Sequence, residues 1–369
     1  MRAILISVGL VLTITTNLFA WSTKEHIQLT RMAIERLIDD PATPADAKQW
    51  LKQILPQPLD LEAERQWFMN ERQGAIPRGV DGVAYWCVMP DMNALMDPNG
   101  RDKIEPFGVA ERPLHYIDLE LFVTGSQKRE YKHDLSGKPK LQDIPRDMKD
   151  PRWIQAGMLP FRVVDCYNKL VTQLRAHHYN DKLGQYPKDE HSAHWAGFLA
   201  HYCEDNTQPQ HATIDYKSSA YFANKRKAPN VHAQVEYELA DDADDDHMTL
   251  RQEYWPAFVK ALGDVNDTTD LADLWKATCE TSLASYDALP MIGVAAMAAT
   301  KQGGTPDHPQ GDTGQKFSTE TFYHAKGTYM GREMTVLEMK AYQQAWAVKR
   351  VQRVLLKAWD DAHQPIAAK

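Results

Sequence analysis

The densest group of metal-binding side chains in the sequence lies between His201 and His211. This segment reads HYCEDNTQPQH, so Asp205 follows His201 by four residues and His211 follows Asp205 by six. A second pair with the same four-residue spacing, His232 and Glu236, comes shortly afterwards. Side chains four residues apart lie on one face of a helix, so each pair can bind one ion. Imidazole and carboxylate ligands without a cysteine cluster are typical of catalytic zinc with open positions.

Four further candidate ligands lie nearer the amino terminus. They are Trp21, His26, Asp91 in the segment MPD, and His115 in the segment PLHYID. Asp91 has the shortest supporting context, and Asp81, Asp97 and Asp102 are alternatives to it. The isolated histidines are interpreted as surface or hydrogen-bonded core residues: His133, His177, His178, His191, His194, His247, His308, His324 and His363.

Together these motifs resemble the zinc-dependent phospholipase C and S1/P1 nuclease superfamily. Its members begin the mature chain with tryptophan and bind three zinc ions inside a helical bundle. The matching motifs extend from Trp21 to Glu236, and the rest of the chain is recognisable only as helical. The resemblance implies an all-α fold, specifically a phospholipase C/P1 nuclease-like helical bundle with long loops.

The resemblance also assigns the ligands of three zinc ions (Zn²⁺). The first ion would be bound by Asp91, His115, His201 and Asp205. The second would be bound by His211, His232 and Glu236. The third would be bound by the α-amino nitrogen and carbonyl oxygen of Trp21, by His26, and again by Asp205. Asp205 would therefore bridge two ions.

The charge of such a cluster favours an anionic substrate. Three Zn²⁺ ions bring six positive charges, whereas Asp91, Asp205 and Glu236 return only three negative ones. A phosphodiester fits, because zinc lowers the pKa of a bound water toward about 7 and neutralises charge that develops at phosphorus. We therefore expect a phosphodiesterase that uses a metal-activated hydroxide, with Asp91 and Asp205 as its catalytic carboxylates.

Two substrate classes remain open. Glu236 resembles the phospholipase C branch, since the nucleases usually carry Asp there, and this places glycerophospholipids first. The five-residue step from Trp21 to His26 instead resembles the nucleases, which makes single-stranded DNA or RNA the alternative. The nucleases often carry a phosphate-contacting arginine where this chain has Ala94. A third interpretation is an inactive, metal-stabilised module that binds phosphate without hydrolysing it.

Tyr116 and Asp118 are candidate substrate-binding residues in either case. With a nucleic acid, Tyr116 would stack on a base and Asp118 would accept a hydrogen bond from its edge. With a phospholipid, Tyr116 together with Tyr85 or Trp86 could face a choline-like cation. A packed aromatic residue in the wall of the bundle is the structural alternative. The many tryptophans and the loop 303–314 would also suit transient contact with a lipid surface, and no obligate protein partner is indicated.

The amino terminus has the features of a secretory signal. Residues 1–20 combine a basic start, an apolar stretch and a final Ala20. Cleavage there would make Trp21 the mature terminus of a secreted or periplasmic protein, and would give it a free α-amine to bind metal. No later segment was expected to span a membrane. The net charge of −8 argues against nucleic-acid binding by a basic surface alone.

Helical periodicity dominates the remaining chain, which we expect to form one domain over residues 21–369. Long loops are expected near 128–152 and 303–314. Four cysteines permit two disulfides in any of three pairings, with a buried free thiol at Cys203 as the alternative: Cys87, Cys166, Cys203 and Cys279. The expected helices cover residues 23–39, 44–55, 161–178, 191–205, 231–239, 251–262, 271–289 and 333–363.

Overall fold

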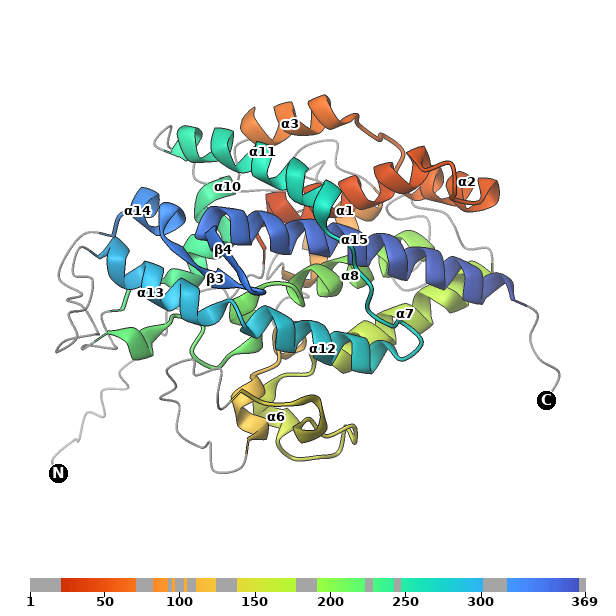
Figure 1. Ribbon diagram of the computed structural model, residues 1–369. Coiled ribbons are helices and arrows are strands. Elements are labelled where there is room, and N and C mark those ends of the chain that lie inside the picture. Colours follow the sequence, from red (N-terminus) through yellow and green to blue (C-terminus); the bar gives the residue numbers. More distant parts are fainter. Residues whose placement is uncertain are drawn as a thin grey trace, which may run out of the picture.

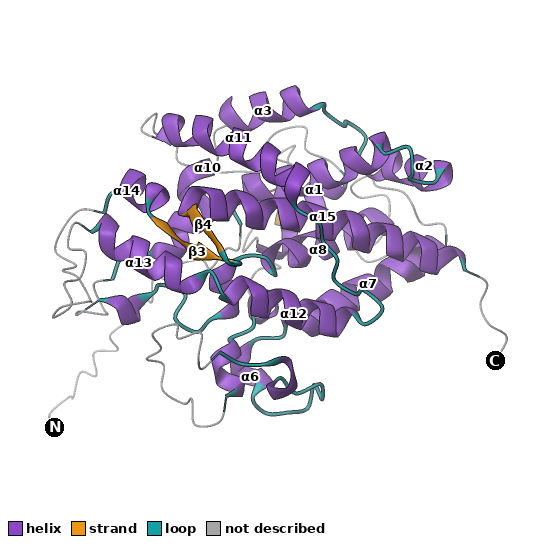
Figure 2. Cartoon of the chain, viewed as in Figure 1, coloured by secondary structure: helices purple, strands orange, loops and turns teal. Residues whose placement is uncertain are grey.

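The computed structural model describes ten stretches of the chain. They are residues 21–70, 82–91, 95–96, 103–104, 111–123, 138–176, 191–222, 228–241, 247–300 and 317–364. The predicted leader 1–20 and the predicted loop 303–314 lie outside these stretches. Within them the chain is mostly helical and belongs to the all-α class (Figures 1 and 2).

Five long helices form the body of the molecule. They are α1 (Thr23–Asp39), α7 (Leu159–Arg175), α8 (Ser192–Asp205), α11 (Met248–Asp264) and α15 (Val336–His363). The carboxyl-terminal α15 packs against the other four and runs across the whole body in Figure 1. One hydrophobic core includes buried residues from Trp21 to Ala362. The final third of the chain therefore completes the core around the segments that carry the metal-binding motif.

Shorter elements connect and cover these helices. The helices are α2 (Ala45–Ile54), α3 (Leu61–Asn70), α4 (Val83–Trp86), α6 (Trp153–Ala156), α9 (Val231–Ala233), α10 (Leu239–Asp241), α12 (Leu274–Tyr286), α13 (Leu289–Ala299) and α14 (Thr319–His324). A π-helix, Gln234–Glu238, joins α9 to α10. Single 3-10 turns cover Met89–Asp91, Arg112–Leu114, Leu119–Phe122, Leu141–Asp143, Pro209–Ala212 and Ser219–Tyr221. Two antiparallel pairs of strands are present, β1 (Leu95–Met96) with β2 (Lys103–Ile104), and β3 (Lys326–Tyr329) with β4 (Arg332–Thr335).

Helix α1 has the predicted bounds because its first turn is capped as the sequence indicates. The Ser22 hydroxyl accepts a hydrogen bond from the Glu25 backbone N–H, and the Glu25 carboxylate accepts one from the Ser22 N–H. This reciprocal capping box satisfies two donors that a helix start would otherwise leave unpaired. It also fixes the direction of the chain between Trp21 and His26.

The predicted helix 333–363 begins three residues later than expected. Residues 332–335 form strand β4, which pairs with β3 through a two-residue turn at Met330 and Gly331. Both turn residues have positive φ, 51° and 72°, as in the tight hairpin turns whose twist matches that of paired strands. Thr335 then caps α15 in a capping box with Glu338. The predicted helix overlapped only the last three residues of this hairpin, and the hairpin itself was not predicted.

Two other predicted helices are interrupted. In the segment 271–289, helix α12 ends at Tyr286, and only Leu289 belongs to α13, which continues to Ala299 beyond the predicted helix. Pro290 occupies the first turn of α13, where a missing N–H costs least. The segment 231–239 contains the π-helix between α9 and α10. Helix α3 was not predicted. The predicted loop 128–152 is described only from residue 138 onward. In this part, a 3-10 turn at Leu141–Asp143 interrupts it.

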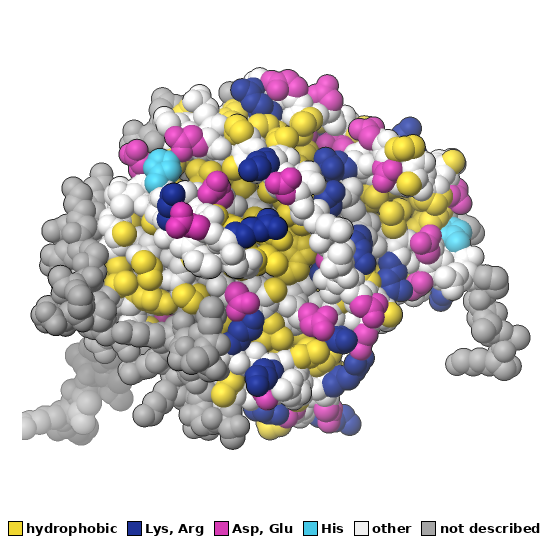
Figure 3. All heavy atoms as spheres, viewed as in Figure 1, with side chains coloured by type: hydrophobic (Ala, Val, Ile, Leu, Met, Phe, Trp, Pro, Cys, Tyr) yellow, Lys and Arg dark blue, Asp and Glu magenta, His cyan; other side chains and the backbone are white. Residues whose placement is uncertain are grey.

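Of the two alternatives for the cysteines, the buried free thiol at Cys203 is the one found, and Cys87, Cys166 and Cys279 are free and buried as well, so neither disulfide that the four cysteines would permit is present. Buried thiols of this kind pack as small apolar side chains. The stretch Leu274–Ala299, spanning α12 and α13, is long and apolar enough to cross a membrane by length and composition, contrary to expectation. However, 67% of an apolar 18-residue window within this stretch is buried inside the protein, as in a core helix. On the face drawn in Figure 3, cationic and anionic side chains are interspersed.

Candidate metal centre

Helix α8 supplies the centre of the site. His201 and Asp205 lie four residues apart in it, and both are fully buried. The Nε2 atom of His201 is 3.3 Å from Oδ2 of Asp205. The Nδ1 atom of His201 donates to the backbone carbonyl of Cys87 at 2.6 Å, which leaves Nε2 directed toward Asp205. The predicted pair therefore faces one point.

Close contact between α4 and α8 makes that orientation possible. A Cβ atom at Gly197 of α8 would lie 2.6 Å from Cβ of Trp86 and 2.8 Å from the backbone nitrogen of Cys87. Any larger residue at Gly197 would push the two helices apart. The close approach brings the Cys87 carbonyl within reach of His201 and places Asp91, at the end of the following 3-10 turn, beside α8.

A first group of ligand atoms combines His115 with the α8 pair. Within it, ligand atoms of His115, His201 and Asp205 all lie within 4.8 Å of one another. The Nδ1 atom of His115 is 2.9 Å from Oδ2 of Asp205 and 3.0 Å from Nε2 of His201. Oδ1 of Asp91 is 3.5 Å from the same His115 nitrogen. This buried group could hold a metal ion.

A second group lies where the first turn of α1 meets the carboxyl-terminal end of α8. Ligand atoms of His26, Asp91 and His201 also lie within 4.8 Å of one another, and this group too could hold a metal ion. The rings of His26 and His201 are stacked with their centroids 4.1 Å apart. Nε2 of His26 is 3.4 Å from Oδ1 of Asp205, and it accepts a hydrogen bond from the Trp21 backbone N–H at 3.3 Å. Asp205 therefore lies between the two groups.

His211, His232 and Glu236 form a looser third group. Nε2 of His232 is 3.2 Å from Oε2 of Glu236, and the ring centroids of His211 and His232 are 5.4 Å apart. The Nδ1 atom of His211 donates to the backbone carbonyl of His115 at 2.6 Å, and the Ile117 N–H donates to the His211 carbonyl at 2.8 Å. These bonds connect the third group to the first. The structure thus brings all nine predicted ligand residues into one region.

Glu204 is an important residue that sequence reasoning missed. Its Oε2 atom accepts a hydrogen bond from Nδ1 of His26 at 2.5 Å, and its Oε1 accepts one from the Thr30 hydroxyl at 2.8 Å. Its backbone carbonyl accepts one from the indole N–H of Trp21 at 2.9 Å. A carboxylate behind a ligand histidine fixes the ring and makes the other nitrogen more basic. Its position beside Asp205 in an otherwise apolar buried helix was the available signal.

Several buried ligand atoms have no hydrogen-bond partner among the described residues. They are both carboxylate oxygens of Asp91, Oδ1 of Asp205, Oε1 of Glu236 and Nε2 of His232. A buried polar atom without a partner is costly, and native proteins rarely contain several together. All five atoms belong to residues of the three groups. A bound cation would give each of them a partner, so the donor set fits a metal centre.

Burial shifts the pKa values of these groups in a consistent direction. It lowers the pKa of His26 and His211 to about 3 and that of His115 and His201 to about 4, so these imidazoles are neutral at pH 7. Neutral imidazole is the form that binds metal. Burial raises the pKa of Asp91 to about 8 and that of Asp205 to about 7 when no cation is near. It raises the pKa of Glu236 as well.

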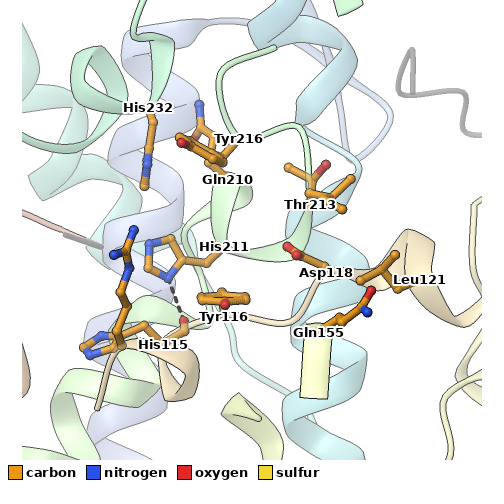
Figure 4. A pocket seen from close by; sticks show the side chains of 12 residues that line it. His115, Tyr116, Asp118, Leu121, Gln155, Gln210, His211, Thr213, Tyr216 and His232 are labelled. Atoms are coloured by element: carbon orange, nitrogen blue, oxygen red, sulfur yellow. Dashed lines mark hydrogen bonds between the residues drawn. The ribbon is translucent and has the colours of Figure 1, made fainter. Parts of the chain in front are cut away.

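A pocket of about 360 Å³ adjoins the first and third groups. In Figure 4, His115, His211 and His232 lie along one side, Asp118, Leu121, Gln155 and Thr213 along the other, and Tyr116 lies between them. Arg112, Gln210, Ile214 and Tyr216 complete the lining. Tyr116 and Asp118 therefore lie where the substrate-binding prediction requires. Tyr85 and Trp86 are only 1% and 3% exposed, belong to the core and do not line this pocket, so their predicted contact with a choline-like cation is not supported.

The pocket wall is held by main-chain bonds to two other segments. The Asp118 N–H donates to the Ala156 carbonyl at 2.7 Å, and the Met158 N–H donates to the Pro113 carbonyl at 2.8 Å. Gly157, with φ of 83°, leaves room for the Tyr116 carbonyl, which lies only 2.3 Å from where its Cβ would be. The segment that contains Tyr116 and Asp118 is thus hydrogen-bonded to α6 on one side and to His211 on the other.

The remaining predictions concern residues away from this centre. His191 is buried and its ring accepts a hydrogen bond from the His194 N–H, and exposed His324 is 2.7 Å from Glu253, in agreement with their interpretation as hydrogen-bonded core and surface residues. The His194 ring is buried and stacks on Trp86 and Trp195. The alternatives to Asp91, the position of Ala94 and four of the isolated histidines lie outside the described residues: Asp81, Asp97, Asp102, Ala94, His133, His177, His178 and His308. No protein-family model matches the chain, and no curated protein matches it significantly.

Proposed function

We propose that this protein is a zinc-dependent phosphodiesterase with the phospholipase C/P1 nuclease-like helical bundle that its motifs resemble. The observation that carries the proposal is the set of unpartnered buried ligand atoms on Asp91, Asp205, His232 and Glu236 beside a pocket that His115, His211 and His232 line. Nine ligand residues suit three zinc ions, as expected from the resemblance. Bound zinc would supply Lewis acidity and a water of lowered pKa.

The charge balance supports an anionic substrate, although less strongly than the sequence indicated. Glu204 adds a fourth carboxylate behind His26, so three Zn²⁺ ions would leave a surplus of two positive charges rather than three. Arg112 adds a further positive charge to the pocket lining. It makes no ion pair or hydrogen bond with the other described residues. We assign Arg112 a phosphate-binding role, which the chain cannot obtain from Ala94.

The other side chains bind, orient and handle protons. The hydrogen bonds from His201 to Cys87, from His211 to His115 and from His26 to Glu204 keep the opposite ring nitrogens directed into the site. Asp205 lies between two ligand groups, and Asp91 has two unpartnered oxygens that can hold a proton near the reacting phosphate. The pocket walls around Tyr116 restrict which group can accompany that phosphate.

For the substrate we propose glycerophospholipids first and single-stranded nucleic acids second. The phospholipid proposal depends on Glu236 in the resemblance, and on Tyr116, Tyr216 and Asp118, which together could surround a quaternary ammonium group. The nucleic-acid proposal depends on Tyr116 as a stacking surface, with Asp118 and Gln155 able to bond the edge of a base.

A direct comparison of substrates tests both the proposed phosphodiesterase activity and the proposed choice of substrate. Protein reconstituted with zinc is incubated with phosphatidylcholine vesicles and, separately, with a single-stranded oligonucleotide, each with and without chelator. Chelator-sensitive release of diacylglycerol supports a phospholipase C, and chelator-sensitive release of nucleotides supports the nuclease. His324→Gln is a suitable control, because the His324 side chain is exposed and pairs with Glu253, which is not one of the proposed ligands. Full zinc occupancy without turnover of any phosphodiester would identify a binding module and reject the enzyme.

A further inference from the structure

A buried lysine from the carboxyl-terminal helix reaches the metal centre. Lys340 of α15 is 0% exposed, and charged side chains are almost never fully buried unless they are paired. Its Nζ atom is 2.7 Å from Oε1 of Glu25 in an ion pair. It also lies 4.9 Å from the centroid of the Trp21 ring, within cation–π range. Lys340 thus contacts the segment that begins at the expected mature terminus.

The same ammonium group contacts the segment that carries Glu236. Nζ donates to the backbone carbonyl of Val235 at 2.5 Å and to that of Glu236 at 3.3 Å. These carbonyls belong to the π-helix Gln234–Glu238, where the backbone departs from the regular hydrogen-bond pattern of an α-helix. Such π-turns are costly and often occur at functional sites. Lys340 therefore satisfies main-chain acceptors in the irregular turn on which Glu236 is placed.

Glu25 extends this connection to the first turn of α1. Its second oxygen, Oε2, accepts the Ser22 N–H at 3.3 Å in the capping box that precedes His26. A single cation therefore joins α15, the start of α1 and the π-helix. Trp21 and His26 lie on one side of this junction, and Glu236 lies on the other.

We propose that Lys340 is a positioning residue that holds the amino-terminal segment and the π-helix together, so that Glu236 and Trp21 reach their metal ions in the correct register. This inference depends on the proposed metal centre, and it assigns a role in metal binding to the carboxyl-terminal third, where the sequence motifs gave none. Lys340 itself binds no metal, because its charge is positive and its contacts are with acceptors.

The test compares Lys340→Met with the double variant Glu25→Gln/Lys340→Met. The single variant leaves the Glu25 carboxylate buried without its partner, which by itself destabilises the fold. The double variant removes that charge, and glutamine can still complete the capping box. Lys357→Met is the matched control on α15, since Lys357 makes a partly exposed ion pair with Asp361. Zinc affinity is measured by competition with a chromophoric chelator, and folding by circular dichroism and melting temperature.

We expect the double variant to recover the melting temperature lost in Lys340→Met, while its weakest-held zinc binds roughly 10- to 100-fold less tightly than in the unmodified protein. The Lys357→Met control should bind zinc normally. Zinc affinity within twofold of the unmodified protein in the double variant would overturn the proposal. Failure of both Lys340 variants to fold would also overturn it, because Lys340 would then serve the scaffold. Activity of the unmodified protein on phosphodiesters decides the proposed function separately.

Discussion

The two histidine–carboxylate pairs have the same spacing in the sequence but different support in the structure. His201 and Asp205 lie in the regular helix α8, and the His201 ring is fixed by the Cys87 carbonyl of the adjacent α4 segment. His232 and Glu236 lie where α9 passes into a π-helix. The carbonyls of that turn are bonded by Lys340, which is 104 residues from Glu236 in the sequence.

This difference shows that two pairs of ligands with the same spacing in the sequence need not be held equally rigidly in the structure. A regular helix positions residues at i and i+4 by its own geometry. An irregular turn needs outside contacts to keep the same two side chains in place. We therefore expect the ions near α8 to be bound more tightly than the ion near His232 and Glu236.

Of the changes that test this comparison, Asp205→Asn should have the largest effect on zinc content and activity. Asp205 approaches both His26 and His115, so its loss disturbs the two compact ligand groups together. We expect a loss of phosphodiesterase activity greater than the roughly 100-fold that follows changes behind metal ligands, and the loss of more than one zinc. Glu236→Gln should remove only one. Equal zinc content in the two variants, measured by plasma mass spectrometry, would show that Asp205 does not link two ions.

Extending the mature chain by one residue before Trp21 should have the next largest effect. The extension replaces the expected free α-amine with an amide, which is a poor metal ligand. The Trp21 nitrogen lies 3.3 Å from Nε2 of His26, so the change occurs beside the second ligand group. We expect the loss of one zinc with an unchanged circular dichroism spectrum. An extended protein with full zinc content and full activity would exclude the terminal nitrogen as a ligand.

Glu204→Gln should have a smaller effect, confined to the second ligand group. Glutamine can still accept the His26 hydrogen bond but no longer carries the negative charge that makes the ring a stronger ligand. We expect zinc affinity at the His26 group to fall by about tenfold. Thr30→Val removes the bond that holds the carboxylate and should give a change in the same direction. Chelator competition that detects no change in either variant would contradict this supporting role.

Asp267→Asn should leave zinc binding unchanged and so provide the contrast with Lys340. Asp267 is buried and forms an ion pair with Arg350 of α15, whose Nε lies 2.7 Å from Oδ2 of Asp267. The control is Asp273→Asn, because Asp273 forms a more exposed ion pair with Arg146. Loss of one member of a buried ion pair costs about 3 kcal/mol, and loss of an exposed one about 0.5 kcal/mol. Urea unfolding measures both. A drop in zinc content in Asp267→Asn would mean that any damage to α15 disturbs the site.

The same residue gives a pH dependence of stability. Burial alone would raise the pKa of Asp267, but the hydrogen bonds and charge of Arg350 hold it well below its usual range. A carboxylate with a lowered pKa in the folded state stabilises the protein fully above its unfolded pKa of about 4, and this contribution is lost as the pH falls below that value. The free energy of unfolding should therefore decrease less between about pH 4 and pH 2 in Asp267→Asn than in the unmodified protein.

Local sequence signals were sufficient for the elements that determine their own structure. The capping box at Ser22 and Glu25 predicted the start of α1, and the apolar periodicity up to Asp205 predicted α8. Ligand spacing in α8 depends only on helix geometry, so convergence of His201 and Asp205 could be foreseen from the sequence.

Features that depend on distant contacts could not be foreseen in this way. The π-helix Gln234–Glu238 accepts hydrogen bonds from Lys340 and from the Tyr323 hydroxyl. The role of Glu204 depends on where His26 and Thr30 lie in space. The hairpin before α15 was not predicted, because its strands are only four residues long and the predicted helix 333–363 included the last three residues of the second strand. The sequence left the choice between disulfides and a free Cys203 open for a related reason, since composition counts thiols but does not show that each is packed separately in the core.

The most direct test of the central claim is the zinc content of the purified protein. The protein is stripped with chelator, reconstituted with zinc, dialysed and measured by plasma mass spectrometry alongside Asp205→Asn. We expect three zinc ions per chain in the unmodified protein and a loss of at least two in the variant. Less than one zinc per chain in the unmodified, folded protein would contradict it.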